Sequence, residues 1–280
     1  MGEFVPHHLS ISSEHTAGNL GAGRFFLLPG SDGRAQRIGE RFSNHQVVPS
    51  DRQLNVHLGQ LECNGEAVDV GAVATGMGCP SLDIVVTELI RLGGRNLLRV
   101  GTAGSLQPGV VQVGDLVIAS GAVRDEATSD AYAPREYPAV ADPDLVRCLE
   151  RAATSCGHGE HTFRGLVHSK DSLFGREFLL GPRAAVNRDY MRQLAEMGVL
   201  ASEMEAAHLL ILADVHRGRP QPLAGLRAPT GAIRCGALLA IIGDEGPFAG
   251  ADVARHAEER AIEVALEGIH ELYRWLVLEG

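Results

Sequence analysis

The stretch LLRVGTAG, residues 97–104, decides the fold prediction, because an apolar run ends here in a glycine-rich segment. Short apolar runs bounded by glycine are typical of buried strands in α/β proteins. Two other stretches have the same form: LLPGSDGR at residues 27–34 and SEMEAA at residues 202–207. In open α/β sheets, ligands bind beside the carboxyl ends of such strands. We therefore expect the three stretches to converge on one site.

Apolar runs and helical patterns also alternate along the rest of the chain. This predicts an α/β fold, a central mixed sheet with helices on both faces in a three-layer α/β/α arrangement. With 280 residues, 45% of them hydrophobic, we expect a single domain over residues 1–280. The expected strands are 25–28, 68–74, 96–100, 115–120, 163–169, 199–202 and 237–242. The expected helices are 34–42, 82–92, 142–155, 187–197, 206–216 and 252–278.

The composition argues against several classes of protein. A net charge of −10 disfavours a dedicated nucleic-acid-binding protein, which needs basic surfaces. The five cysteines are odd in number and form no Cys-x-x-Cys motif, as expected where thiols stay reduced. No secretory signal and no apolar run of membrane-spanning length is present in the sequence. We expect a cytoplasmic protein that has neither nucleic acid nor a membrane as a partner.

The turn after the first expected strand is a candidate anion site. Gly30 permits a tight turn whose amides face a ligand, and the N-terminus of the following helix adds partial positive charge. Arg34 would add a charged, forked donor. The alternative is a plain Pro29-Gly30 turn with Arg34 on the surface.

Arg99 is a second candidate, because it lies inside an apolar run. Burying an unpaired guanidinium is very costly, so Arg99 needs an anionic partner, which is either a structural carboxylate or a bound phosphate. Thr102 and the amides of residues 101–104 would complete a cradle for an anion.

Glu203 and Glu205 flank Met204 and supply two carboxylates. In a strand, alternate residues point to one side, so both could face a ligand and one could hold sugar hydroxyls. In the alternative interpretation they lie at a helix start, where acidic residues are favoured.

Other motifs give weaker signals. GMGCPS at residues 76–81 resembles a dinucleotide fingerprint only superficially, and the sequence contains no P-loop, nucleophile elbow or zinc-protease motif. The 12 histidines are dispersed, so no metal site is expected. Residues 218–234 are expected to form a surface or subunit-contact loop. Residues 243–250 are expected to form a mobile flap over the site.

These segments together resemble the hexameric nucleoside phosphorylase family, which includes uridine phosphorylases and bacterial purine nucleoside phosphorylases. The resemblance runs from His8 to the last helix. It is most specific in LLPGSDGRAQRI (27–38), LLRVGTAGSLQPGVVQVGDLVIASGAV (97–123), PAVAD (138–142) and SEMEAA, and the central segment is most similar to uridine phosphorylases. The resemblance implies phosphate as a co-substrate, no cofactor, and a homo-oligomer, usually a hexamer, with a dimer as the smallest active unit.

The resemblance also implies roles for individual residues. Positions that match phosphate-binding residues are Gly30, Arg34, Arg99 and Thr102, together with Arg52, which matches an arginine that reaches a neighbouring subunit's phosphate. His8 matches a histidine donated by the neighbour to the sugar 5′-hydroxyl. The remaining expected nucleoside contacts are Ala103, Gly104, Leu173, Glu203, Met204 and Glu205, of which Met204 and Glu205 match the ribose-contacting pair.

Base recognition departs from the family pattern. Uridine phosphorylases carry a Gln-x-Arg pair that clamps uracil, and residues 171–178 contain no such pair, although Arg176 or Glu177 could substitute. Asp244 falls near the position where purine phosphorylases place an aspartate that protonates the base. The alternative for Asp244 is a turn residue in Gly-Asp-Glu-Gly.

The expected activity is reversible phosphorolysis of a nucleoside, uracil or purine, with Arg99, Glu205 and Asp244 as catalytic residues. One alternative is a nucleosidase of the same fold, although such a hydrolase gains nothing from Arg34 and Arg99. The other is a nucleoside-binding protein without catalytic activity.

Overall fold

The computed structural model describes residues 4–216, 233–244 and 248–278. Its strands are β1 (Phe25–Leu28), β2 (Ser43–Val48), β3 (Val56–Cys63), β4 (Glu66–Val73), β5 (Asn96–Ser105), β6 (Leu116–Asp125), β7 (Ala139–Val140), β8 (Thr162–Lys170), β9 (Ala201–Glu203) and β10 (Arg234–Gly243). Its α-helices are α1 (Asp32–Gly39), α2 (Cys79–Arg91), α3 (Pro143–Ser155), α4 (Ala184–Glu196), α5 (Ala206–His216) and α6 (Ala251–Tyr273). Two π-helical turns are η5 (Leu173–Glu177) and η6 (Arg274–Leu278). In the described residues no helix is long and apolar enough to cross a membrane.

The strands form one mixed sheet in the order β10-β6-β8-β9-β5-β1-β4-β3-β2. Because β10 also pairs with β5, the strands β5, β10, β6, β8 and β9 close into a ring. Small and branched apolar side chains pack between these strands, among them Ala103, Val117, Val167 and Leu239. The mixed sheet confirms the predicted fold class, whereas the ring closure was not predicted.

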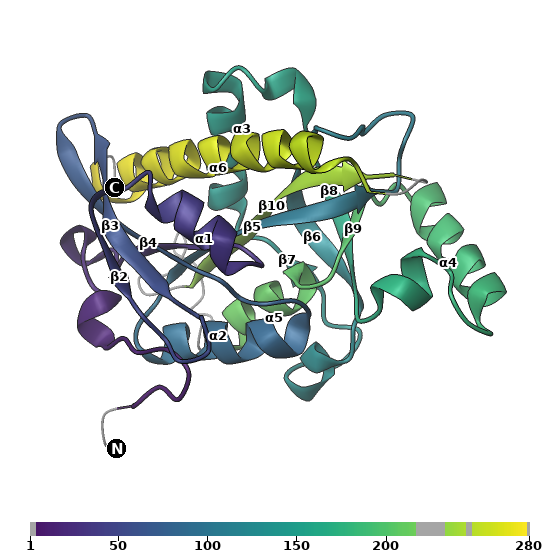
Figure 1. Ribbon diagram of the computed structural model, residues 1–280, viewed down its shortest axis with the longest axis horizontal. Helices are drawn as coiled ribbons and strands as arrows, with labels where there is room; N and C mark the ends of the chain where they lie inside the picture. The colour runs from purple at the N-terminus through teal and green to yellow at the C-terminus, as the bar shows by residue number, and fades with distance from the viewer. Residues whose placement is uncertain (1–3, 217–232, 245–247, 279–280) are drawn as a thin grey trace, which may run out of the picture.

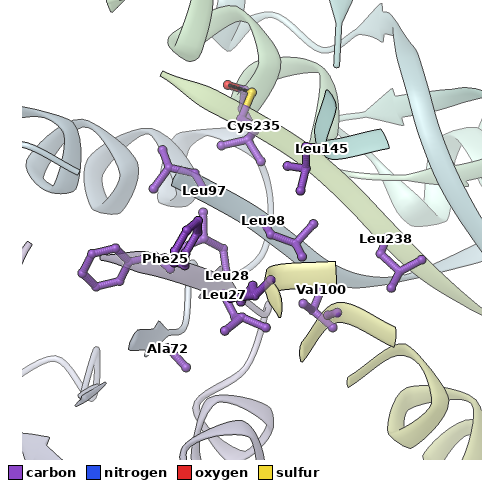
Figure 2. Close-up of a cluster of buried hydrophobic side chains, with 14 of the residues drawn as sticks. Phe25, Leu27, Leu28, Ala72, Leu97, Leu98, Val100, Leu145, Cys235 and Leu238 are labelled. Atoms are coloured by element: carbon purple, nitrogen blue, oxygen red, sulfur yellow. Dashed lines mark hydrogen bonds between the residues drawn. The ribbon is translucent and has the colours of Figure 1, made fainter. Parts of the chain in front are cut away.

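Helices cover both faces of the sheet (Figure 1). α3 and α6 run along one face, where α1 joins them, and α2 and α5 pack together on the other. The apolar runs of β1 and β5 belong to the main core, to which Phe25, Leu97 and Leu98 contribute buried side chains (Figure 2). The expected three-layer arrangement is therefore confirmed.

Helix boundaries follow from local signals. Asp142 caps α3, since its Oδ1 accepts hydrogen bonds from the amides of Asp144 and Leu145 at 3.1 and 3.0 Å. α5 has the predicted bounds, Ala206–His216. α1 begins at Asp32, two residues before the predicted start, because Ser31 acts as its N-cap. The last helix was expected over 252–278 with Val253 on its apolar face, but α6 runs from Ala251 to Tyr273 and Val253 is half exposed.

The prediction missed the hairpin of β2 and β3. β2 is a polar strand at the edge of the sheet and is mostly exposed, so it lacks the apolar run that marks a buried strand. The predicted loop 218–234 lies largely outside the described residues, and its last residue, Arg234, begins β10.

β5 is twice as long as predicted and continues to Ser105. Its residues pair with β10 as far as Gly104, and Gly104 also faces Ser202 of β9. On its other side, β5 pairs with β1 only as far as Arg99 and with β9 only at Gly104 and Ser105, so an anion cradle formed by amides of residues 101–104 stays a prediction.

Candidate active site

A cavity of about 260 Å³ lies where β1, β5, β8, β9 and β10 approach one another. The three stretches that opened the sequence analysis do converge here, on the neighbouring strands β1, β5 and β9. The cavity is lined by Gly30, Ser31, Arg34, Gly76, Met77, Arg99, Thr102, Ala103, Gly104, Lys170, Leu173, Glu177, Ser202, Glu203, Met204, Glu205, Ile242 and Phe248. However, β9 runs antiparallel to β5. The three stretches therefore do not all lie at the carboxyl ends of parallel strands.

Arg99 is held by two carboxylates at the centre of the cavity wall. Its Nε donates to Glu203 Oε2 at 3.0 Å, and its Nη2 donates to Glu205 Oε2. Gly101 leaves room beside this arrangement, because a Cβ there would lie 2.8 Å from Leu239 Cδ2 and 3.0 Å from Arg99 Nε. Of the two partners that the sequence left open for Arg99, this structure shows the carboxylates. Its Nη1 is buried and has no hydrogen-bond partner among the described residues.

Glu203 is fixed from several sides. Its carboxylate accepts hydrogen bonds from the Glu205 and Ala206 amides, both at 2.9 Å, and from the Ser169 hydroxyl. Glu203 is the last residue of β9, in keeping with the strand interpretation, and its carboxylate also caps the start of α5. Burial favours the neutral carboxyl, but Arg99 and these donors lower the pKa of Glu203 below its usual value.

Glu205 differs from Glu203 although both contact Arg99. Its Oε1 accepts a hydrogen bond from the Gly78 amide at 2.5 Å, in the loop between β4 and α2. Burial and the nearby charge of Glu203 raise the pKa of Glu205, in opposition to Arg99. Glu205 thus has fewer donors than Glu203 and is the carboxylate better able to exchange partners with a ligand.

Arg34 lies at the β1 end of the cavity and is largely buried. Its Nη2 donates to Glu258 of α6, which also binds Arg37, and its Nη1 donates to the Val100 carbonyl at 3.2 Å. Burial lowers the pKa of Arg34 below its usual value, although the contact with Glu258 opposes this effect. The contacts with Arg34 and Arg37 lower the pKa of Glu258, in opposition to its burial. In the described part of the chain, no group accepts a hydrogen bond from the buried Nε of Arg34. The interpretation of Arg34 as a plain surface residue is therefore wrong.

A second ion pair, between Lys170 and Glu177, lies at the other end of the cavity. Lys170 Nζ is 2.6 Å from Glu177 Oε2, and it also donates to Ser202 Oγ at 2.8 Å and to the Glu203 carbonyl at 3.3 Å. Arg176 does not line the cavity, because it binds Asp125 and Asn187 instead. Of the two candidates for base recognition, only Glu177 faces the ligand space.

Three predicted site residues lie outside this cavity. His8 and Arg52 line a separate cavity of about 600 Å³ at the N-terminal segment, where the His8 ring binds Glu88 at 2.8 Å. Asp244 is exposed and directly follows β10. The predicted flap at 243–250 is described only in part, and its Phe248 lines the cavity.

Sequence reasoning missed Lys170, Ile242 and the hydrogen bond of Gly78 to the site, whereas Ser202 and Phe248 belong to segments that were expected there. A signal existed for Lys170, because a lysine that ends an apolar strand needs a partner just as Arg99 does. No group of metal-ligating side chains occurs within the described residues.

Comparisons with known proteins agree with this geometry. The sequence profile of the phosphorylase superfamily matches residues 24–267, and the chain belongs to this family. It is 35% identical to a uridine phosphorylase of Treponema pallidum over 88% of both chains. It is 33% identical to a uridine phosphorylase of Thermococcus kodakarensis, over 90% of this chain and 83% of the relative. It is 32% identical to a guanosine phosphorylase of Halorubrum lacusprofundi, over 88% of this chain and 92% of the relative.

Proposed function

We propose that this protein is a nucleoside phosphorylase, a pentosyltransferase that exchanges the base of a nucleoside for phosphate. The main support is one cavity that places Arg34 and Arg99 beside Glu205. The guanidinium groups suit a phosphate, and a carboxylate suits the adjacent hydroxyls of a ribose. The uridine and guanosine phosphorylases among the relatives are in keeping with this assignment.

Phosphate binds at the β1 end of the cavity in this proposal. Arg34 Nε and Arg99 Nη1 are buried donors without protein acceptors among the described residues, and a bound oxyanion would satisfy both. Gly30 and Thr102 line the same cavity and complete the phosphate contacts. Phosphate is a co-substrate, and the proposal requires neither a metal nor an organic cofactor.

The sugar lies between the two ends, against Met204 and Glu205. As the bond from C1′ to the base nitrogen lengthens, its electron pair leaves with the base and C1′ becomes positive. A phosphate oxygen then forms the new bond to C1′, which gives ribose 1-phosphate. The site works mainly by positioning the reactants and by placing charges in advance.

The base lies near Ala103, Gly104, Leu173 and Glu203 in this proposal. Asp244 acts as the general acid that supplies a proton to the departing base nitrogen, from its position next to the end of β10. Uracil and purine nucleosides are both compatible with the relatives.

A second copy of the chain would complete the site. His8 and Arg52 line one cavity, away from the candidate active site, so they could reach a neighbour together. In the proposed assembly His8 contacts the neighbour's sugar 5′-hydroxyl and Arg52 its phosphate. The smallest active unit is then a dimer, built into a hexamer, and the enzyme works in the cytoplasm.

Phosphate dependence tests the proposed function. Release of base from uridine, inosine, guanosine and adenosine is measured with and without phosphate, together with the formation of ribose 1-phosphate. We expect release only with phosphate. Equal rates without phosphate would identify a nucleosidase, and binding without any release would identify a nucleoside-binding protein.

A further inference from the structure

The ion pair between Lys170 and Glu177 is the feature of the cavity that the phosphate and sugar contacts do not use. Lys170 is buried at the end of β8, and Glu177 belongs to the π-helical turn η5. Removing two charges from water costs free energy that their attraction often fails to recover. A pair of a buried lysine and a partly exposed glutamate on the wall of a ligand cavity therefore suits recognition of a ligand better than stabilisation of the fold.

The contacts of Lys170 and Glu177 indicate a different role for each residue. Lys170 Nζ donates hydrogen bonds to Ser202 and to the Glu203 carbonyl, and it forms an ion pair with Glu177, so one of its three hydrogens remains for Glu177 or for a ligand. Lys170 is therefore a positioning residue, which fixes the Glu177 carboxylate in place. Glu177 Oε2 lies beside this ammonium and is buried without a hydrogen-bond partner among the described residues.

Gly104 of β5 leaves the space that the Glu177 carboxylate occupies. A Cβ at Gly104 would lie only 2.6 Å from Glu177 Oε1, so any side chain there would displace the carboxylate. The glycine at the end of β5 thus keeps an acceptor oxygen open on the cavity wall. The other oxygen, Oε2, is buried without a hydrogen-bond partner among the described residues, and a ligand that brings an N–H or O–H group would satisfy it.

The cavity has room for the base at this end. From Arg34 beside β1 to Lys170 on β8, the path crosses the strands β1, β5, β9 and β8. Three strand spacings amount to roughly 14 Å, which is enough for phosphate, sugar and base in line. Leu173, Ile242 and Phe248 line the cavity as well and offer apolar surfaces for the faces of a base.

The three groups Oε1, Oε2 and Nζ form a series of acceptor, acceptor and positive donor. The matching edge of a base carries donor, donor and acceptor, which is the order of the amino group, ring N–H and carbonyl of guanine. Uracil fits less well, because its ring N–H lies between two carbonyl oxygens that a carboxylate repels. Adenine fits less well too, because it has no ring N–H on this edge.

We propose that Glu177, positioned by Lys170, selects nucleosides of 2-amino-6-oxopurines, an inference that rests on the proposed function. The guanine amino group and ring N–H donate to the Glu177 carboxylate, and the carbonyl lies on the side of the Lys170 ammonium. Inosine keeps the ring N–H and the carbonyl but lacks the amino group. It should therefore rank between guanosine and uridine.

The test compares the wild-type protein with Glu177→Gln and, as a matched control, Glu196→Gln. Glu196 is an exposed carboxylate on the nearby α4 and does not line the cavity. Phosphate-dependent kcat/KM is measured for guanosine, inosine, uridine and adenosine. We expect the wild-type order guanosine, inosine, uridine. We expect E177Q to lower the value for guanosine by roughly 10- to 100-fold, mainly through KM, and that for uridine by much less.

The outcomes separate this inference from the proposed function. A wild-type preference for uridine, or an equal loss on all nucleosides in E177Q, overturns the inference and leaves the phosphorylase intact. Release of base from none of the nucleosides overturns both. If E177Q does not fold, thermal stabilisation of the wild-type protein by guanine and by uracil decides, because the inference requires a larger shift with guanine.

Discussion

The two arginines of the cavity are held in different ways. Arg99 lies on β5 against Glu203 and Glu205, and both carboxylates are also bound by backbone amides. Arg34 lies on α1 against Glu258, a partly exposed side chain on α6 that Arg37 shares. Arg99 is thus held by two buried carboxylates, whereas Arg34 has a single carboxylate partner that is partly exposed. Arg34 is therefore the arginine better placed to exchange a carboxylate for a phosphate.

The largest effect is expected for Arg99→Ala. The substitution leaves two buried carboxylates without their cation, which costs about 3–5 kcal/mol of unfolding free energy. It also removes a phosphate contact, and we expect phosphorolysis to fall by roughly 1,000-fold. Denaturant unfolding and the phosphate-dependent rate measure the two losses separately.

The variant Arg99→Lys is the control for this prediction. Its ammonium keeps a cation beside Glu203 and Glu205 and should retain most of the stability, but it lacks the forked guanidinium donor and should retain little of the activity. If activity returned with stability, Arg99 would serve the fold alone and the comparison of the two arginines would fail.

Smaller effects on rate and stability are expected for substitutions of the two carboxylates that bind Arg99, and these effects should differ between Glu203 and Glu205. Glu205→Gln should lower kcat/KM for the nucleoside by roughly 100-fold and change stability little, because Glu205 is proposed to hold the sugar. Glu203→Gln should instead cost about 1–3 kcal/mol of unfolding free energy, because a helix cap and a buried partner are lost. Steady-state kinetics and thermal unfolding measure both variants. A greater loss of rate in folded E203Q than in E205Q would contradict these roles.

The smallest effect concerns the partner of Arg34. Glu258→Gln removes the charge that competes with phosphate, so KM for phosphate should fall by roughly 2- to 5-fold with kcat nearly unchanged. Glu259→Gln is the matched control, since Glu259 binds Arg37 and Arg41 but not Arg34. A rise of KM in E258Q would show that Glu258 positions Arg34 and does not compete with phosphate.

Much of the fold could be predicted because the signals were local. The apolar runs of β1 and β10, the cap at Asp142 and the bounds of α5 follow from neighbouring residues. β2 could not be predicted from an apolar pattern, because an exposed edge strand has none. For the site, the sequence identified Arg34, Arg99 and Glu205. It did not identify Lys170, whose partner comes from the turn that follows β8.

The sequence by itself determined which segments become strands and helices. It also placed cations and carboxylates on or directly after three of the strands. These properties depend on side-chain periodicity and on capping, which act over a few residues. Only the tertiary structure decided the ring of five strands, the pairing of Arg99 with a carboxylate 104 residues away, and the fit of Glu177 against Gly104. Those contacts depend on strand order and on close approach between distant segments, which local patterns do not record.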